Sequence, residues 1–312
     1  MSFGHDTTTN EVLQGIDLTG KTAFVTGASG GLGAETARAL ASKGATVTIG
    51  ARDRAKAEGV AEEIRAATGA TVDIAEVDLT SLPSVRACAQ AWLESHGSLN
   101  LLINNAGVMA CPLTRVDNGW ELQFATNHLG HFLLTGLLLP ALKAGAPARI
   151  VNLSSAGHRF GGIHFDDIHY EHRPYNKFEA YGHSKTANVL FSVGLTRRLA
   201  NLGITANAVH PGVIMTDLGR HLTEEDLADF PSDTPIEEMQ FKTVESGAAT
   251  SVWAATAPEL EGKSGIYLED CHIALPANET DDGGYNEWAV DPEAAEKLWA
   301  LSEELVGEKI RI

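Results

Sequence analysis

The chain has 312 residues, of which 44% are hydrophobic, and a formal net charge of −18 at pH 7. This length and hydrophobic content are enough to bury a large core. The strong negative charge repels nucleic acid and anionic membrane surfaces, so neither is expected as a partner. The three cysteines are far apart and odd in number, which is typical of reduced thiols in a cytoplasmic protein.

The sequence shows neither a secretory signal nor a membrane span. Residues 1–19 lack a basic start and a continuous apolar run. The longest apolar run, residues 132–142, is interrupted by Thr135, Gly136 and Pro140, and is shorter than the roughly 20 residues that cross a bilayer. We therefore expect no export and a buried core helix over this run.

The chain begins with a strand, a glycine-rich turn and a helix. Residues 21–25 form a short apolar run, residues 26–33 read Thr-Gly-Ala-Ser-Gly-Gly-Leu-Gly, and residues 34–43 have helical spacing. Glycines there let a pyrophosphate approach the free N–H groups and the positive dipole end of the helix. Because no Gly-Lys-Ser/Thr follows, a nucleoside triphosphate loop is disfavoured, and a dinucleotide is the expected ligand.

Apolar strands alternate with helical patterns along the rest of the chain. The predicted strands are residues 46–50, 71–77, 99–103, 149–153, 204–209 and 264–267, and the predicted helices are residues 55–68, 82–96, 119–144, 180–201 and 243–255. This order predicts an α/β fold of the doubly wound Rossmann type, with a mainly seven-stranded parallel sheet and helices on both faces. We assign residues 20–280 to this single domain, and residues 1–19 and 281–312 to extensions. Ligands of such sheets bind outside the carboxyl ends of the strands.

A phenol and an ammonium stand four residues apart in the sequence Tyr-Gly-His-Ser-Lys at residues 181–185. On a helix this spacing places Tyr181 and Lys185 on one face. An ammonium beside a phenol stabilises the phenolate, so a group whose ordinary pKa is about 10 can exchange protons nearer to neutral pH. The pair is therefore a candidate acid/base device.

Taken together, these features resemble the short-chain dehydrogenase/reductase family. The matching motifs, in the family's order, are Thr26-Gly-x3-Gly31-x-Gly33, Asp78-Leu79, Asn104-Asn-Ala-Gly107, Asn127, Ser154-Ser155, Tyr181-x3-Lys185 and Pro211-Gly212-x3-Thr216. Residues 108–112, 121–135 and 263–271 resemble the branch of the retinol dehydrogenases, the WW-domain oxidoreductase and the similar chloroplast translocon-associated proteins of plants. No WW-like segment is present, so the resemblance covers only the oxidoreductase part.

The resemblance implies a catalytic tetrad of Asn127, Ser155, Tyr181 and Lys185. Tyr181 exchanges a proton with the substrate oxygen, and Lys185 lowers the pKa of Tyr181 and binds the nicotinamide ribose. Ser155 holds the substrate oxygen, with Ser154 as the weaker alternative. Asn127 fixes a water that passes protons to Lys185. Hydride transfer belongs to the cofactor.

The resemblance also implies which residues bind the cofactor, namely Thr26, Gly27, Ser29, Gly31, Leu32, Gly33, Arg52, Asp78, Leu79, Asn105, Ala106, Gly107, Tyr181, Lys185, Pro211, Gly212, Val213 and Thr216. Ala51 stands at the position of the family's NAD-selecting acid and Arg52 follows it, which favours NADP(H) over NAD(H). Asp53 complicates this preference, because it can pair with Arg52 or accept a ribose hydroxyl.

Two segments bear on the substrate. The 25 residues between Ser155 and Tyr181 form an insertion that is expected to roof the pocket, and residues 217–242 stand where the family carries a mobile lid. Aromatic walls and a lid indicate a bulky, mostly apolar alcohol, aldehyde or ketone, unless the aromatic side chains only pack the insertion. The candidate substrate-binding residues are Ser155, His158, Phe160, Tyr175 and Met215.

Histidines are abundant in this region, at positions 158, 164, 169, 172 and 183. Their spacing follows no compact ligand motif, and the branch that the chain resembles uses no metal, so surface or packing histidines are expected and a metal site is not. His128 and His131, three residues apart on a predicted helix, are expected to be structural.

The sequence therefore predicts an NADP(H)-dependent alcohol dehydrogenase or carbonyl reductase that acts on a hydrophobic small molecule. The alternative from another class is an NADP(H)-binding redox sensor or regulatory protein with little turnover. Epimerisation or dehydration on the same fold is disfavoured by the glycine spacing and by the absence of a larger C-terminal domain. The resemblance implies a homodimer or homotetramer through the helices that begin near Gly119 and Ala180, although the tail with Trp288 and Trp299 can alter this.

Overall fold

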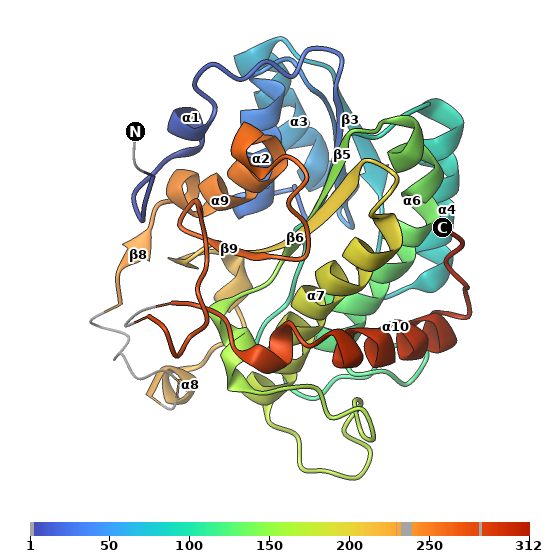
Figure 1. Cartoon of the computed structure of the whole chain (residues 1–312), viewed down its shortest axis with the longest axis vertical. Helices are drawn as coiled ribbons and strands as arrows, with labels where there is room; N and C mark the ends of the chain where they lie inside the picture. The colour runs from blue at the N-terminus through green and yellow to red at the C-terminus, as the bar shows by residue number, and fades with distance from the viewer. Residues whose placement is uncertain (1–2, 229, 232–238, 281–282) are drawn as a thin grey trace.

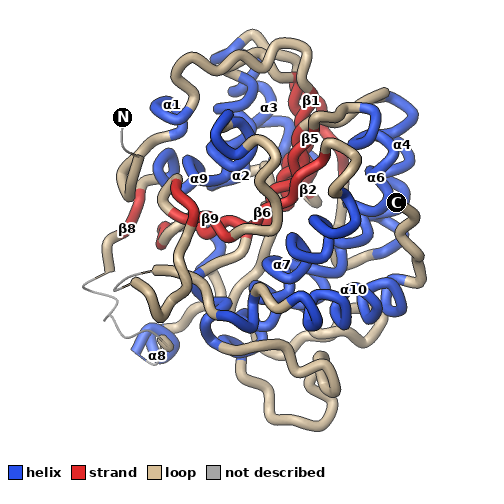
Figure 2. Tube along the Cα trace, viewed as in Figure 1, coloured by secondary structure: helices blue, strands red, loops and turns tan. Residues whose placement is uncertain are grey.

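The computed structural model describes residues 3–228, 230–231, 239–280 and 283–312. Its main sheet consists of β1 (Thr22–Thr26), β2 (Thr46–Ala51), β3 (Val72–Glu76), β4 (Leu101–Asn104), β5 (Ala148–Leu153), β6 (Ile204–His210), β9 (Tyr267–Glu269) and β10 (His272–Ile273). The order is β10-β9-β6-β5-β4-β1-β2-β3. Strands are coloured red in Figure 2. Seven of these strands are parallel, and β10 runs antiparallel to β9. The predicted doubly wound sheet is confirmed, with one antiparallel edge strand added.

Helices cover both faces of this sheet (Figure 1). One layer contains α1 (Thr9–Val12), α2 (Gly31–Ala41), α3 (Arg54–Thr68) and α9 (Val244–Thr256), and the other contains α4 (Leu82–Ser95), α6 (Gly130–Ala144), α7 (Lys177–Leu199) and α10 (Pro292–Val306). Side chains alternate between the layers along a strand: Ala23 and Val25 face the first layer, and Phe24 faces the second. In the described part of the chain, no helix is both long and apolar enough to span a bilayer.

Local capping explains where the predicted helices begin and end. The carboxylate of Asp53 accepts a hydrogen bond from the Lys56 N–H at the start of α3, and Gly69, with a φ of 69°, ends the helix. At the start of α7 the Asn176 side chain accepts hydrogen bonds from the N–H groups of Phe178 and Glu179. Such caps lie within four residues of the boundaries expected from the apolar pattern.

The helix predicted over residues 119–144 is divided into three parts. Its first turn, α5 (Leu122–Phe124), is capped by the carboxylate of Glu121. A π-helical turn, η1 (Ala125–Leu129), connects α5 to α6. Such turns are frequent at functional sites, and this one contains Asn127.

The predicted lid, residues 217–242, begins shortly after β7 (Val213–Ile214) and ends with β8 (Phe241–Lys242), and these two strands form a small second sheet. It contains a short 3-10 turn, η3 (Asp217–Gly219), and the helix α8 (Glu224–Ala228). Asp226 of α8 forms an ion pair with Lys177 of α7, so the lid is attached to the helix that carries Tyr181. Residues 229 and 232–238 of the lid lie outside the described residues.

Both predicted extensions dock on the core. Near the N-terminus, Leu13 and Leu18 are buried among the residues of the first helix layer. In the C-terminal extension, of which residues 281–282 lie outside the described residues, α10 packs along α7 (Figure 1). Its Trp299 is buried, with the ring centre 5.0 Å from that of Phe132 and 3.9 Å from the Arg198 guanidinium carbon.

Candidate active site

The predicted site residues meet at the carboxyl ends of four neighbouring strands. The glycine-rich loop follows β1, residues 105–107 follow β4, Ser154 and Ser155 follow β5, and residues 211–216 follow β6. These strands are adjacent in the order β6-β5-β4-β1, so their ends lie side by side. The structure thus brings the motifs to one edge of the sheet.

The glycine-rich loop packs closely on the segment after β4. A Cβ atom on Gly27 would come within 2.8 Å of the Ala106 Cα, and one on Gly33 would come within 2.5 Å of the Gly27 carbonyl oxygen. Gly31, at the first position of α2, is exposed and has a φ of 54°. No side chain caps the N–H groups at this end of α2, so they remain available to an anion. The loop fits a pyrophosphate.

The hydroxyl of Thr26 joins three parts of the site. Its Oγ1 accepts hydrogen bonds from the N–H groups of Asn105 and Ala106, at 2.9 and 3.0 Å, and lies 2.8 Å from Nε2 of His131. The Nδ1 of His131 lies 3.0 Å from the carbonyl oxygen of Asn127. Burial lowers the pKa of His131 to about 4, so the ring is neutral and can donate at Nδ1 while accepting at Nε2. His131 is therefore structural, as expected.

The Ser155 side chain acts on the Tyr181 phenol as a hydrogen-bond partner that lowers the pKa of the phenol, against the effect of burial. Gly157 permits this approach, because a Cβ atom at its position would lie 2.7 Å from Cε1 of the phenol ring. Ser154 differs from its neighbour: it is buried, and its Oγ donates to the Lys185 carbonyl oxygen at 2.9 Å. The second serine of the pair is thus the one that shares a hydrogen bond with the phenol.

Lys185 is buried beside the phenol, with Nζ 5.6 Å from the centre of the Tyr181 ring. Its Nζ donates to the Leu153 carbonyl oxygen at 3.0 Å, which holds the ammonium at the end of β5. Burial lowers the pKa of Lys185 to about 8. Burial also raises the pKa of Tyr181 to about 12, although the hydrogen bond with Ser155 acts in the opposite direction. The lowered Tyr181 pKa expected from the spacing is therefore not found, because burial of the phenol outweighs it.

Asn127 makes more direct contacts than a water-binding role requires. Its Oδ1 accepts from the Val108 N–H at 2.8 Å, and its Nδ2 donates to the Val108 carbonyl oxygen at 2.9 Å and to Ser184 Oγ at 2.8 Å. A Cβ atom on Gly107 would lie 3.3 Å from Asn127 Oδ1 and 3.6 Å from Lys185 Nζ. The glycine thus keeps the space between these two polar groups open.

The end of β2 carries the residues expected to select the cofactor. Arg52 is exposed, whereas the Asp53 carboxylate caps α3 by accepting from the Lys56 N–H at 3.0 Å. The Lys56 ammonium extends toward the glycine-rich loop: its Nζ would lie 3.6 Å from a Cβ on Gly30, and it pairs with Asp217 at 3.3 Å. Sequence analysis missed Lys56, which lies in the first turn of α3, four residues after Arg52.

The segment after β6 is attached to the Ser155 loop by His210. Its Nδ1 accepts hydrogen bonds from the N–H groups of Ala156 and Gly212, at 3.2 and 3.4 Å. Burial lowers the pKa of His210 to about 3, which keeps the ring neutral and able to accept. Farther along, the Thr216 side chain lies near Gly31, 3.7 Å from a Cβ placed there. Residues 211–216 therefore lie between the serine loop and the glycine-rich loop.

The predicted adenine-side residues lie farther along the sheet, after β3. The Oδ1 of Asp78 accepts from the backbone N–H and the hydroxyl of Thr80, at 2.9 and 2.7 Å. Leu79 is buried and packs on Gly130 at the start of α6. The carboxylate of Asp78 is thus held in a turn at the carboxyl end of the edge strand.

The structure corrects the predicted substrate contact of His158. Its side chain is fully buried, with Nδ1 2.7 Å from the Ser155 carbonyl oxygen and Nε2 accepting from the Asn286 N–H at 3.2 Å. Its ring also packs on Tyr267, at 4.9 Å between ring centres. Because both ring nitrogens are used by the backbone, His158 attaches the C-terminal extension to the serine loop rather than presenting a polar group to a substrate.

Two further substrate candidates lie in different surroundings. The hydroxyl of Tyr175 donates to the Cys111 carbonyl oxygen at 2.9 Å and accepts from Gln123 Nε2 at 2.8 Å, so it belongs to a hydrogen-bonded network. Met215, by contrast, is 79% exposed. The polar end of Tyr175 is thus already used, and only the exposed thioether remains free to meet a ligand.

Phe160 forms an aromatic cluster with Phe178 and Phe230, with ring centres 5.4 to 6.5 Å apart in edge-to-face arrangements. The three rings come from the insertion, from α7 and from the segment after α8. The insertion and the lid therefore meet through apolar contacts. Sequence analysis missed two other residues, Ser184, which lies inside the Tyr-x3-Lys motif, and Gly157, which follows Ser155 by two residues.

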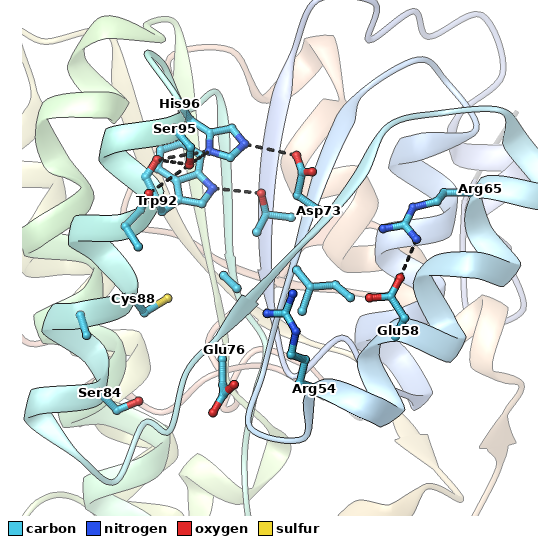
Figure 3. Close-up of a pocket in the computed structure, with 15 residues that line it drawn as sticks. Arg54, Glu58, Arg65, Asp73, Glu76, Ser84, Cys88, Trp92, Ser95 and His96 are labelled. Carbon is cyan, nitrogen blue, oxygen red and sulfur yellow. Dashed lines mark hydrogen bonds and ion pairs between the residues drawn. The ribbon is translucent and has the colours of Figure 1, made fainter.

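A separate groove of about 850 Å³ runs along the edge strand β3, between α3 and α4 (Figure 3). Several of its polar side chains are paired with one another: Trp92 Nε1 donates to Thr48 Oγ1 at 2.9 Å, and His96 Nε2 lies 3.3 Å from the Asp73 carboxylate. None of the predicted catalytic, cofactor-binding or substrate-binding residues is among those that line this groove.

Comparison with known proteins agrees with this geometry. Residues 21–227 match the model of the family described as short chain dehydrogenase. The chain is 45% identical over 301 residues to retinol dehydrogenase 14 of Mus musculus, covering 92% of this chain and 86% of that protein. A crystal structure of an uncharacterized protein from Mycobacterium paratuberculosis has a TM-score of 0.76 and 33% identity, covering 98% of this chain and 100% of that one.

A short chain dehydrogenase from Burkholderia cenocepacia J2315, solved in complex with NADP, has a TM-score of 0.63 and 26% identity, covering 81% of this chain and 97% of that one. Similarity thus extends over most of the chain in both sequence and structure. The chain is an oxidoreductase that belongs to the short-chain dehydrogenase/reductase family, in its retinol-dehydrogenase-like branch.

Proposed function

We propose that this chain is an NADP(H)-dependent oxidoreductase that interconverts a bulky, mostly apolar alcohol and its ketone or aldehyde. The observation that carries the proposal is the grouping of the buried Tyr181 phenol with the buried Lys185 ammonium, 5.6 Å from the phenol ring, at the loop that carries Ser155 and Gly157. A carbonyl oxygen that takes the place between the two hydroxyls meets a hydrogen-bond donor and a proton donor together.

In the reducing direction, Tyr181 donates its proton to the substrate oxygen, while Ser155 donates a hydrogen bond to the same atom. The raised pKa of Tyr181, about 12, keeps the phenol protonated at neutral pH, which suits a proton donor. In the oxidising direction Tyr181 must first lose its proton, and a charged Lys185 stabilises the resulting phenolate. A nicotinamide cofactor, when bound, supplies or accepts the hydride.

Several residues are placed to hold that cofactor. The free N–H groups at the start of α2 bind the pyrophosphate, and residues 211–216 hold the carboxamide. The preference for NADP(H) is supported by the exposed guanidinium of Arg52 and by the Lys56 ammonium near the glycine-rich loop, since both match a 2′-phosphate. Asp53 is used as a helix cap, and one similar structure was solved with NADP.

The substrate class is supported by the aromatic cluster of Phe160, Phe178 and Phe230, which lines the contact between the insertion and the lid. Apolar walls of this kind suit a ligand with little polarity beyond the reacting oxygen. The name of the relative retinol dehydrogenase 14 points to an alcohol of the same kind.

The test follows NADPH and NADH oxidation at the nicotinamide absorbance, with retinal and other bulky aromatic and aliphatic aldehydes and ketones, for the wild type and for Tyr181→Phe. We expect turnover with NADPH that falls at least about 10²-fold in the variant, while NADPH binding persists. Preference for NADH would overturn the argument from Arg52. Tight NADPH binding without turnover on any substrate would favour the redox-sensor alternative.

A further inference from the structure

We propose that His164, Glu179 and His183 bind one zinc ion that attaches the insertion after β5 to α7. His164 lies in the loop that follows the 3-10 turn η2 (Ala156–Phe160), and the other two residues lie one helical turn apart on α7. Their donor atoms all lie within 4.8 Å of one another. The inference does not depend on the proposed function.

The separations match those between ligands of a tetrahedral zinc ion. Glu179 Oε1 lies 3.3 Å from His183 Nε2 and 3.5 Å from His164 Nε2. With zinc–ligand bonds of about 2.0–2.2 Å, ligand atoms of a tetrahedral site are about 3.4 Å apart. The two histidine nitrogens lie within 4.8 Å of each other. Because the His164 side chain is 53% exposed, it has room to bring its nitrogen closer to that of His183.

An independent observation comes from His183. Its side chain is almost completely buried, yet its Nε2, which points at the cluster, makes no hydrogen bond, although Glu179 Oε1 lies 3.3 Å away. An unpaired nitrogen in such a place is costly unless something binds it. The other nitrogen, Nδ1, lies 3.3 Å from the Tyr170 hydroxyl, which can accept the Nδ1–H and leave the Nε2 lone pair for a metal.

The charges around the cluster are compatible with a divalent cation. Arg173 Nη1 donates to Glu179 Oε1 at 2.7 Å, but a carboxylate offers about four lone-pair sites, so a metal can share it. Arg173 also faces Asp167, with 3.5 Å between Nε and the carboxylate oxygen, and this second carboxylate balances the guanidinium charge. Two imidazoles and one carboxylate favour zinc over the oxygen-seeking calcium and magnesium ions.

The ion would be structural rather than catalytic. Glu179 and His183 are each two residues before Tyr181 and Lys185, which is a rotation of about 200° around the helix. The zinc ligands and the catalytic pair therefore occupy opposite faces of α7. A metal on the outer face holds residues 161–176 against the helix without contact with the reacting atoms.

The experiment uses the whole chain, free of any histidine tag and stripped of metal with a chelator that is then removed. Calorimetric titration with zinc chloride, together with elemental analysis, should give one equivalent of bound zinc. Cobalt chloride should give the visible absorption of a tetrahedral Co²⁺ site. Zinc should also raise the unfolding temperature and protect residues 161–176 from limited proteolysis.

His164→Ala and Glu179→Gln should each weaken zinc binding at least about tenfold. The exposed position of His164 makes its replacement compatible with folding, and circular dichroism checks this. The matched control is His172→Ala, which removes an exposed histidine of the same insertion from outside the cluster. Absence of zinc binding in the wild type, or wild-type affinity in His164→Ala, would overturn the proposal.

Discussion

The side chain of Asn127 holds the backbone of Val108 at both of its polar groups, with Oδ1 2.8 Å from the N–H and Nδ2 2.9 Å from the carbonyl oxygen. The same Nδ2 donates to Ser184, whose hydroxyl in turn donates to the Tyr181 carbonyl oxygen at 2.7 Å. The segment after β4 and the helix that carries Tyr181 are thus connected through one amide side chain.

Asn127→Ala is therefore expected to lower stability as well as turnover. It leaves the N–H and the carbonyl oxygen of Val108 without this partner and removes the hydrogen bond that the Ser184 hydroxyl accepts, and each unsatisfied buried group costs about 1–3 kcal/mol. Thermal unfolding and steady-state kinetics should both change. If the unfolding temperature stays at the wild-type value while turnover is lost, Asn127 acts through a bound water, as the family resemblance implies, and not by holding the backbone of Val108.

Substitutions of the two neighbouring serines should have different effects, one on kcat and the other on the free energy of unfolding. Ser155→Ala removes the hydroxyl bonded to Tyr181, so we expect kcat to fall by about 10²–10³ with little change in the unfolding temperature. Ser154→Ala removes a buried hydrogen bond to the Lys185 carbonyl oxygen, so we expect a loss of about 1 kcal/mol in the free energy of unfolding and most of the activity to remain. The reverse pattern would assign the substrate oxygen to Ser154.

Arg52→Ala should raise the KM for NADPH by about tenfold or more and leave the KM for NADH unchanged, because only the former offers a 2′-phosphate to the guanidinium. Arg54→Ala, at the exposed start of α3, is the matched control. Asp53→Ala should lower the free energy of unfolding by about 1 kcal/mol through loss of the helix cap, without weakening the binding of NADH. Equal losses for both cofactors in Arg52→Ala would contradict the proposed preference.

The parts of the fold that could be predicted from the sequence depend on local patterns. The strand expected at residues 46–50 is β2, Thr46–Ala51, because an apolar run between a glycine and an arginine is informative by itself. The glycine-rich loop was equally predictable from its motif, because Gly33 approaches the Gly27 carbonyl oxygen within the same strand-turn-helix unit. The approach of Gly27 to Ala106, which follows β4, was not visible in the local pattern.

The parts that could not be predicted depend on contacts between distant positions. Asn127 finds its backbone partner 19 residues earlier in the chain, and His158 finds one 128 residues later. Nothing in the spacing of either residue identifies such a partner. The short strand β10 and the π-helical turn η1 have the same origin, because tertiary packing rather than local propensity determines them.

The pH dependence of catalysis should show a break near pH 8. Lys185 has its pKa lowered to about 8 by burial, so it is charged below this pH and neutral above it. Carbonyl reduction, which leaves a phenolate on Tyr181, should be constant below pH 8 and fall above it as the stabilising charge is lost. Alcohol oxidation should rise with pH instead, because it starts from the ionised phenol.

Profiles of kcat/KM between pH 6 and pH 10, about two units on either side of the break, measure this for the free enzyme. Lys185→Arg is the control variant, because its guanidinium stays charged over the whole range. The break should therefore disappear in the variant even where its overall rate is lower. A break at the same pH in both proteins would assign the titration to another group.

Trp299 should determine whether α10 stays on the face of α6 and α7. These helices are the ones through which the family resemblance implies subunit pairing, and in this structure α10 lies along them. Trp299→Ala removes a buried side chain, so we expect a loss of about 3–5 kcal/mol in the free energy of unfolding. Trp288→Ala, a change at a 42% exposed residue of the same extension, should cost much less.

Sedimentation velocity completes this test. While α10 covers α6 and α7, we expect any homo-oligomer to form through another surface. Chemical cross-links should therefore not connect α6 or α7 of one wild-type copy to these helices of a second copy. Loosening of α10 in Trp299→Ala exposes the apolar rings of Phe132 and Phe191 and should increase the sedimenting mass. A wild-type dimer cross-linked through α6 and α7 would mean that α10 moves aside on assembly, because both cannot cover the same rings.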